Sequence, residues 1–386
     1  MDKLIATLQH YAWGDPTFIA SLQRRDPSGE PEAELWMGAH PKAPSHLSTS
    51  GRRLDELIAS DTGATLGPAA RFGELPFLAK ILAAAQPLSI QTHPDQARAA
   101  AGFERENDAG VPLDAPDRTY RDPNHKPELI CALTSFEAKC GFRSLDETRE
   151  LVASLGATIA PLAERLAQDG TDCEVLHDVL LWLLKADARE ATVLTNALAA
   201  ACSTAAPGPW TSAIDCTASL QELYPGDPGV VVALLLNHFT LAPGEALFLE
   251  AGVLHAYVRG AGVEIMANSD NVIRGGLTPK HIDVDELAAV VDCSPIDPPV
   301  QQPESSAHTY HSPVGEFALT RLALDGECQV EVEGPEILVA GEGAFTISAD
   351  DHAVDIGPGE PVWIPASDAA WGAAGSGVLF RVTVPV

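Results

Sequence analysis

Two 18-residue segments of this chain resemble each other, and this repeat constrains the fold more than any other feature. The first, LAPGEALFLEAGVLHAYV, begins at Leu241, and the second, IGPGEPVWIPASDAAWGA, begins at Ile356. Each has a Pro-Gly-Glu turn, an apolar run typical of a strand, and a turn of small residues. Turn-strand-turn units of this kind build double-sheet jelly rolls. The repeat therefore predicts two barrels.

The two units differ at the position where a metal ligand is expected. Laid over one another without gaps, His255 of the first unit falls opposite Ala370 of the second. A cupin, which is a small jelly-roll barrel, presents a metal-binding histidine from its wall in this way. We therefore expect only the first barrel to hold a metal.

The texture of the sequence changes along the chain and predicts four segments. Gly, Pro and Asp interrupt short apolar runs such as LPFLAKIL, which favours strands, until an Ala- and Leu-rich stretch with helical spacing begins at Ser144. Ser144 and Glu147 form a candidate capping box. The predicted fold is mainly β with a helical insert, namely two cupin-type jelly-roll barrels plus an α-helical domain. The predicted segments are a catalytic cupin domain, first part (1–143), the helical insert (144–223), the second part with the active-site loop (224–293), and a C-terminal cupin-like domain without metal (294–386).

The charge composition of the chain argues against two classes of binding partner. The 386 residues carry a net charge of -30, so repulsion disfavours nucleic acid and anionic membranes. The N-terminus lacks the apolar segment of a secretory signal, and the seven cysteines are scattered without C-x-x-C spacing, which together predict a reducing cytoplasm.

The helical insert could be a lid over the pocket or an interaction surface; its apolar stripe favours the lid. The oligomeric state stays open, and a monomer is compatible with the sequence.

A metal site is predicted from four donors in three separate segments. Gln91 and His93 lie two apart in PLSIQTHPD, so a strand would direct both to one face. Glu128 in DPNHKPELI and His255 complete a set of nitrogen and oxygen donors without thiolate. Such a set suits one zinc ion per chain, with room for water or substrate, although iron or manganese would accept much of it.

Cations are concentrated next to the predicted metal ligands. In the stretch from His255 to Asp283, Arg274 and Lys280 have no adjacent run of carboxylates to neutralise them. In so acidic a chain this arrangement indicates a site for an anion such as a phosphate or an enediolate.

Several long motifs occur in an order that resembles one known family. They are ELWMGAHPKAPS, PLSIQTHPD, DRTYRDPNHKPEL, FEAKCGFR and NVIRGGLTPKHID. With them the chain resembles the type I mannose-6-phosphate isomerases over its first 140 residues and from Tyr224 to Asp283. The resemblance implies a zinc-dependent aldose-ketose isomerase that interconverts mannose 6-phosphate and fructose 6-phosphate through a cis-enediol, serving mannose and GDP-mannose metabolism.

The resemblance also implies roles for individual residues. The zinc ligands would be the four donors named above, and Arg274 would be an active-site residue that stabilises the enediolate. The other residues implied to line the pocket are Ser89, Lys80, Lys126, Tyr257, Glu264, Asp270 and Lys280. We expect the phosphate to be bound by Lys80, Lys280 and Ser89. As the base we favour Lys126, if the metal and Arg274 promote its neutral amine, and His125, Glu264 and Asp270 stay open as alternatives.

Two other classes compete with an isomerase. Cupins with two histidines and one glutamate often hold iron for oxygen chemistry. A non-catalytic sugar-phosphate sensor is the second rival. The cations beside the site favour an anionic sugar over O2, and the net charge of -30 weighs against the basic DNA-binding helix that a sensor would need.

Overall fold

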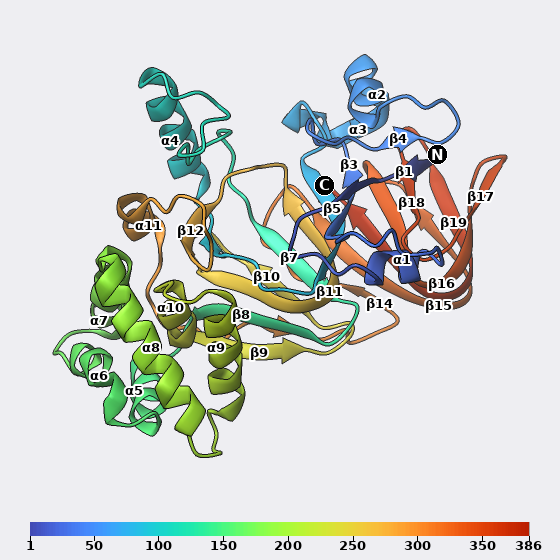
Figure 1. The fold of residues 1–386 in the computed structure, drawn as a ribbon. Coiled ribbons are helices and arrows are strands. Elements are labelled where there is room, and N and C mark those ends of the chain that lie inside the picture. Colours follow the sequence, from blue (N-terminus) through green and yellow to red (C-terminus); the bar gives the residue numbers. More distant parts are fainter. Residues whose placement is uncertain (386) are drawn as a thin grey trace.

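The computed structural model describes residues 1–385, and most of its regular structure outside one helical block belongs to two antiparallel sheets (Figure 1). The fold is mainly β with a helical insert, as predicted. The eight-stranded sheet consists largely of C-terminal strands, with three of 14 residues forming its broad face. Its C-terminal members are β14 (Ala307–Thr309), β15 (Ala318–Glu331), β16 (Glu336–Ala349), β17 (His352–Ile356), β18 (Pro361–Ile364) and β19 (Ala370–Thr383).

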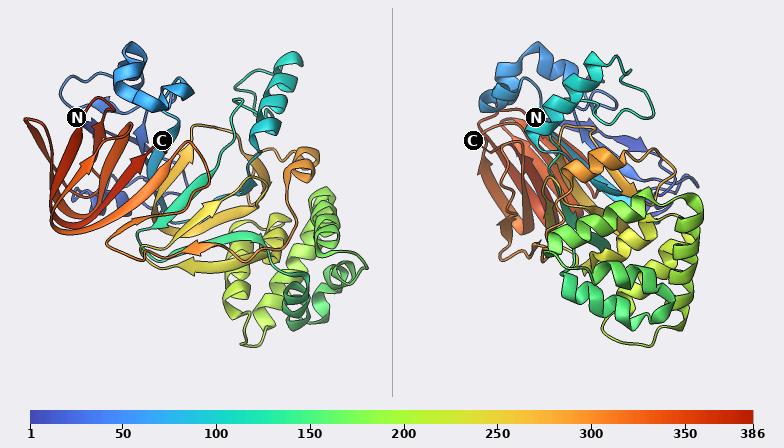
Figure 2. Two further views of the ribbon diagram at one scale, coloured as in Figure 1. Left: turned by 180° about the vertical axis from the view of Figure 1, so that it is seen from behind. Right: turned by 90° about the vertical axis from the view of Figure 1, so that its left-hand side faces the viewer.

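The first strand of the chain also belongs to this C-terminal sheet. β1 (Asp2–Ile5) pairs antiparallel with β18 and with β4 (His46–Leu47). Both chain ends therefore lie at the same end of the molecule, as two opposite views show (Figures 1 and 2). The segment 1–143 consequently contributes to both sheets, a pairing that its local sequence does not reveal.

The eleven-stranded sheet holds the predicted metal ligands. Its long strand β11 pairs with β6 and β8 through its first residues and with β5 and β7 through its later ones, so it links both parts of the sheet. The members are β2 (Thr7–Gln9), β3 (Glu34–Gly38), β5 (Phe77–Ala84), β6 (Ile90–Thr92), β7 (Glu128–Ala132), β8 (Phe136–Phe142), β9 (Leu236–Leu241), β10 (Ala246–Leu249), β11 (His255–Ala267), β12 (Ile273–Gly276) and β13 (Val300–Gln301).

The sequence repeat has a direct structural counterpart. In the first copy β10 ends at Leu249, and after a turn His255 is the first residue of β11. In the second copy β18 ends at Ile364, and Ala370 is the first residue of β19. The gapless alignment of His255 with Ala370 therefore matches structurally equivalent strand starts.

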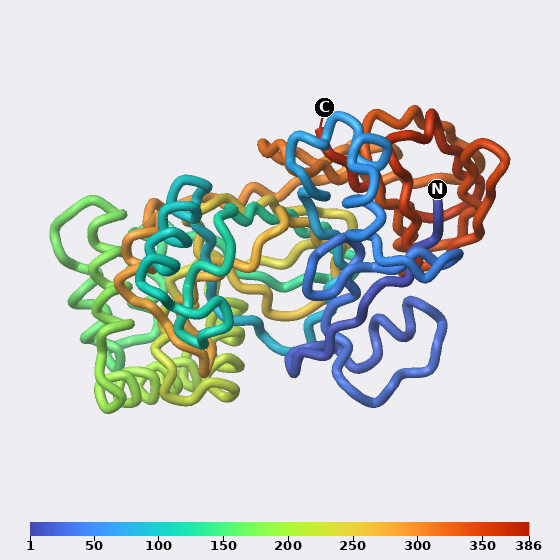
Figure 3. The backbone as a smooth tube through the Cα atoms, turned by 90° about the horizontal axis from the view of Figure 1, so that it is seen from above, coloured from blue at the N-terminus to red at the C-terminus, as the bar shows by residue number. Residues whose placement is uncertain are grey.

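The helical block lies at the end of the molecule away from the C-terminal sheet (Figure 3). The Ser144 side chain accepts a hydrogen bond from the Glu147 backbone N–H, so the N-cap half of the predicted capping box is confirmed. The Glu147 carboxylate accepts from the Ser144 hydroxyl and not from its backbone N–H. The block's apolar residues share one buried core with Ile90, Leu254 and Ile273 of the metal-bearing sheet. Its members are α5 (Leu145–Ser154), η2 (Ala157–Ile159), α6 (Ala160–Leu166), α7 (Asp172–Lys185), α8 (Ala188–Thr204), α9 (Thr211–Leu223) and α10 (Gly229–Leu235).

Some helices lie where strands and turns were expected. The run GVVVALL forms α10, which is buried on every side, so its β-branched residues gave no periodic signal to separate a helix from a buried strand. A helix after PLSIQTHPD was also missed; Asp95 caps it by accepting from the Arg98 backbone N–H. The helices outside the block are α1 (Phe18–Leu22), α2 (Leu54–Ser60), α3 (Thr62–Leu66), η1 (Gly67–Phe72), α4 (Gln96–Asp108) and α11 (Val284–Val290).

Candidate active site and metal centre

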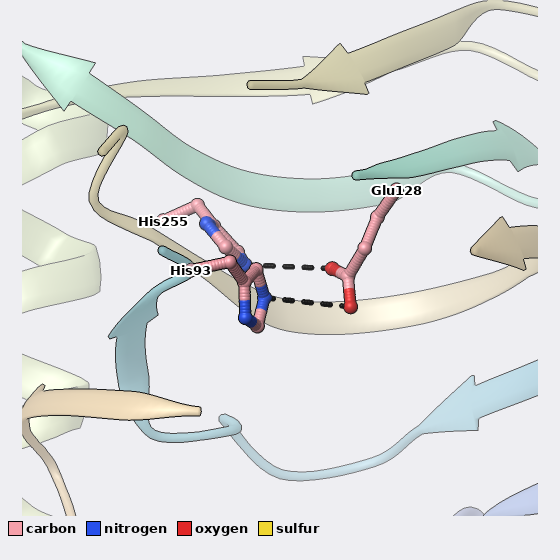
Figure 4. A group of neighbouring side chains, drawn as sticks. All are labelled: His93, Glu128 and His255. Atoms are coloured by element: carbon pink, nitrogen blue, oxygen red, sulfur yellow. Dashed lines mark ion pairs between the residues drawn. The ribbon is translucent and has the colours of Figure 1, made fainter. Parts of the chain in front are cut away.

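Two histidines and one glutamate converge at the centre of the eleven-stranded sheet (Figure 4). His93 follows β6, Glu128 opens β7 and His255 opens β11, and all three side chains are buried. His93 Nε2 lies 3.4 Å from Glu128 Oε1, and His255 Nε2 lies 3.6 Å from Glu128 Oε2. Their donor atoms all lie within 4.8 Å of one another. This is the grouping that a single metal ion needs.

The outer nitrogens of both imidazoles are already engaged by the backbone. His93 Nδ1 donates to the carbonyl of Asn271 at 2.8 Å, and His255 Nδ1 donates to the carbonyl of Val253 at 3.1 Å. Because a carbonyl only accepts, these bonds place the proton on Nδ1 and leave each Nε2 lone pair facing the centre. Burial lowers the pKa of His93 to about 4, so its ring is neutral at pH 7.

The chemistry of the donor set fits a metal ion. Within residues 1–385, His93 Nε2 and Glu128 Oε2 are buried atoms without a hydrogen-bond partner. Buried polar atoms rarely stay unpaired, and a cation would satisfy both. Burial alone would raise the pKa of Glu128, but the charge of Lys126 holds it well below its ordinary value, so the carboxylate is ionised.

Gln91 is the fourth donor at the same place. It pairs with His255 across β6 and β11, and its amide nitrogen lies 3.4 Å from His255 Nε2. A half-turn of the terminal amide presents the carbonyl oxygen there instead, which is the atom that could bind a metal. The structure thus brings together the four residues that the sequence suggested as metal ligands.

A small cavity of about 190 Å³ lies beside the metal ligands and contains several predicted residues. Lys126 Nζ lies 3.0 Å from Glu128 Oε1, directly next to the ligand set. Tyr257 contributes a buried hydroxyl that has no partner in the described part of the chain. Because burial holds the pKa of Tyr257 well above 10, this hydroxyl keeps its proton and can donate to a bound sugar.

Lys80 lies in the same inner cavity, where two carboxylates balance its positive charge. Its ammonium group lies 2.9 Å from Glu264 Oε2 and 3.4 Å from Glu34 Oε1. Burial opposes the charge, yet these two carboxylates raise the pKa of Lys80, so it stays protonated. Two neighbouring carboxylates balance the charge of Lys80, so its attraction for a phosphate is weak. The geometry therefore does not favour the phosphate-binding role expected for Lys80.

A larger cavity of about 670 Å³ adjoins the first and holds the unneutralised cations. Arg274 and Lys280 line it together with Ser89, as expected, and Arg121 joins them. Burial and the mutual repulsion of these cations lower the pKa of both Arg274 and Lys280. None of the three cations makes an ion pair with another described residue. Such a cluster is prepared for an anion.

Arg121 is a residue that the sequence reasoning missed. Its backbone N–H donates to Asn271 Oδ1 at 2.7 Å, and Asn271 Nδ2 donates to the carbonyls of Asp122 and Asn124, each at 2.8 Å. Asn271 is fully buried, and its own carbonyl orients His93. One residue, through its backbone carbonyl and its side chain, therefore connects the metal centre with the cation cluster. The only signal for Arg121 was its place in the motif DRTYRDPNHKPEL.

The candidates for the base lie in different surroundings. Asp270 pairs with Lys42 at 2.8 Å and lies 3.7 Å from His40, two residues of ELWMGAHPKAPS that were not singled out. Burial would raise the pKa of Asp270, but the hydrogen bond from Lys42 and the charge of His40 bring it below its ordinary value. Asp270 is therefore a poor proton acceptor.

His125 points away from the metal centre. Its ring bonds to Glu316 at 2.8 Å and lines a separate cavity of about 180 Å³ with residues of η1 and the C-terminal part of the chain. Neighbouring residues on an extended backbone point to opposite sides, and Lys126 takes the side of the metal ligands. The geometry therefore gives no support to the alternative of His125 as the base.

A second group of donors does not make a comparable centre. Glu137, Cys216 and His238 also lie within 4.8 Å of one another, between β8, β9 and α9. His238 Nε2 already bonds to Glu137 at 2.8 Å, so the polar atoms of this pair have partners without a metal.

Among residues 1–385, none of the helices has the length and apolar character of a membrane span.

The fold and the site together define a cupin-type metalloprotein with a cation-lined anion pocket. A family model for the catalytic domain of type I phosphomannose isomerase matches residues 1–145. Mannose-6-phosphate isomerase from Escherichia coli (strain K12) is 40% identical over 99% of both chains, and that from Rattus norvegicus is 32% identical over 99% of this chain and 95% of its own. A crystal structure of mannose 6-phosphate isomerase bound with zinc and yttrium superposes with a TM-score of 0.93, at 39% identity over the full length of both.

The chain belongs to the mannose-6-phosphate isomerase family of aldose-ketose isomerases.

Proposed function

We propose that this protein interconverts mannose 6-phosphate and fructose 6-phosphate with one zinc ion held by Gln91, His93, Glu128 and His255. One observation carries the proposal. A four-donor centre of nitrogen and oxygen atoms opens, through a small polar cavity, onto a larger cavity lined by three cations that make no ion pair with a described residue. In a chain of net charge -30, that arrangement suits a sugar at the centre and its phosphate at the cations.

Of the three cations in the larger cavity, Arg274 is the best placed to stabilise an enediolate. Arg274 lies directly opposite Gln91 in the pairing of β12 with β6, so both side chains project from the same face of the sheet. It can therefore lie between the metal centre and the phosphate. Arg121, Lys280 and Ser89 are left to hold the phosphate oxygens.

The proposed isomerisation moves one proton between the carbons and one between the oxygens, through a cis-enediol. A base takes the C2 proton of the open-chain aldose, C1 then receives a proton, and the O2 hydroxyl proton is transferred to O1. Bound zinc supplies Lewis acidity that polarises the substrate oxygens. Among the remaining candidates, Glu264 is enclosed by its pair with Lys80, whereas Lys126 lies beside the ligand set. We assign the proton transfer to Lys126, which must accept the proton as a neutral amine.

Lys126 and His125 offer a matched test because they are adjacent in sequence and face different cavities. We expect Lys126→Gln to lower kcat by about 100-fold to 10,000-fold, the usual contribution of a general base. His125→Gln should leave kcat within about twofold of wild type, because a surface-side substitution away from the site has small effects. Steady-state kinetics with mannose 6-phosphate measure both. Full activity of Lys126→Gln would reject this base.

The proposal as a whole is tested by turnover of mannose 6-phosphate, measured as fructose 6-phosphate formed. Protein stripped with a chelator should lose this activity, and zinc should restore it, because metal ligation provides the polarisation that the reaction needs. Iron in place of zinc, assayed for oxygen uptake, provides the control for an oxygenase. A protein that binds zinc tightly but converts no aldose phosphate would be a metal-binding cupin or a sugar-phosphate sensor instead.

A further inference from the structure

The segment YPGDPG, from Tyr224 to Gly229, joins α9 to α10 at the edge of the helical block and contacts two segments that line the outer cavity. Tyr224 donates its hydroxyl hydrogen to the carbonyl of Pro87 at 3.1 Å, close to Ser89. Asp227 accepts a hydrogen bond from the backbone N–H of Thr278 at 3.1 Å, close to Lys280. One short segment is therefore bonded to both parts of the cavity wall.

The contact around Asp227 is tight and holds an unusual backbone. Asp227 also accepts from the backbone N–H of Gly229 at 2.7 Å, where α10 begins. A side chain on Gly276 would lie only 2.4 Å from the Cα atom of Gly229, so the two backbones touch. The next residue, Leu277, is buried and has φ of 54°, a left-handed conformation that needs support from its surroundings.

We infer that Asp227 and Tyr224 are positioning residues for the anion cavity. Asp227 fixes the turn at Leu277 and Thr278 and thereby the place of Lys280, while Tyr224 fixes the segment that carries Ser89. A lysine side chain loses much rotamer freedom when it grips an anion, so a fixed backbone lowers the remaining cost of binding. The identification of the anion as the phosphate of a sugar rests on the proposed function; the positioning of an anion site does not.

The first test is Asp227→Asn. Asparagine offers one oxygen where aspartate offers two, and its amino group cannot accept, so one of the two backbone hydrogen bonds is lost. We expect KM for mannose 6-phosphate to rise about tenfold, the scale of one lost hydrogen bond to a charged group, with a smaller change in kcat. The inhibition constant of inorganic phosphate should rise in parallel, and zinc content should stay at the wild-type level.

Asp187→Asn is the matched control. Asp187 caps α8 by accepting from the backbone N–H groups of Arg189 and Glu190, in the same helical block, and it does not line the cavity. Asp187 accepts both bonds on Oδ1, so Asp187→Asn keeps an oxygen for them and removes only the charge of a capping carboxylate. Any fall in the thermal midpoint that both variants share therefore measures the loss of a capping charge in the helical block. KM should be unchanged in this variant. An equal rise of KM in both variants would overturn the inference.

A double-variant cycle separates positioning from general loosening. Because Asp227 is inferred to act through Lys280, its effect on KM should be much smaller when Lys280 is already alanine. Multiplicative effects of Asp227→Asn and Lys280→Ala would overturn that route. Tyr224→Phe gives an independent test through the other wall and should raise KM by a few-fold, as expected for one neutral hydrogen bond; an unchanged KM would overturn the role of Tyr224.

Failure of the proposed function can be told apart from failure of this inference. A wild-type chain without turnover would reject the isomerase proposal, while calorimetric titration with inorganic phosphate would still measure the anion cavity. About tenfold weaker phosphate binding by Asp227→Asn than by Asp187→Asn would support the inference. Equal phosphate binding by the two variants would overturn it.

Discussion

Glu128→Gln is expected to remove the bound zinc and to lower kcat by about three orders of magnitude or more, because Lewis-acid stabilisation is worth several kcal/mol. Glu128 is the single carboxylate among the four proposed donors, and the other three are two imidazoles and an amide. Its replacement leaves the ion without an anionic ligand and leaves Lys126 without its partner 3.0 Å away. Zinc per chain after dialysis, measured by mass spectrometry, should fall from one to near zero.

Glu316→Gln controls for the loss of a carboxylate beside an imidazole. Glu316 bonds to His125 at 2.8 Å, as Glu128 faces His93 and His255, but it lies in the separate cavity behind the site. We expect this variant to keep one zinc and nearly full turnover. Zinc retained in Glu128→Gln at wild-type affinity would mean that the ion binds elsewhere.

Arg274→Ala is expected to lower kcat by about 100-fold to 1,000-fold while zinc stays bound, the usual cost of removing one preorganised group from a developing anion. The guanidinium is partly buried and makes no ion pair with another described residue, so its charge is available to the substrate. Arg274→Lys should recover part of the rate because it restores the charge without the planar donor geometry.

The division between kcat and KM decides what Arg274 does. An unchanged kcat with a raised KM would show that Arg274 holds the phosphate in the ground state, which contradicts its assignment to the enediolate. Arg259→Ala is the control, because Arg259 is exposed on β11 and does not line either cavity. Its kinetics should match wild type.

The local parts of the site could be predicted from the sequence. Because side chains alternate along a strand, Gln91 and His93 point to the same side. The Pro-Gly-Glu repeat places His255 at the start of a strand. The unusual density of unpaired cations near Arg274 stands out in so acidic a chain. Turn chemistry and side-chain alternation act over a few residues, so they leave a legible pattern.

Partnerships across the sheet could not be predicted. Lys80 is an unremarkable lysine in an apolar run until the register of β5 with β11 sets it beside Glu264. Arg121 becomes part of the cation cluster only because Asn271 holds its loop. Each of these pairs joins residues more than 100 positions apart.

The sequence by itself determined the mainly β fold with a helical block, the donor types of the metal centre and the anionic character of the ligand. Periodicity, capping and charge are properties of short segments and need no knowledge of distant contacts. The tertiary structure decided which cations remain free, which way His125 and Lys126 face, and that β1 belongs to the C-terminal sheet. These outcomes depend on strand register and long-range packing, which a local sequence pattern does not encode.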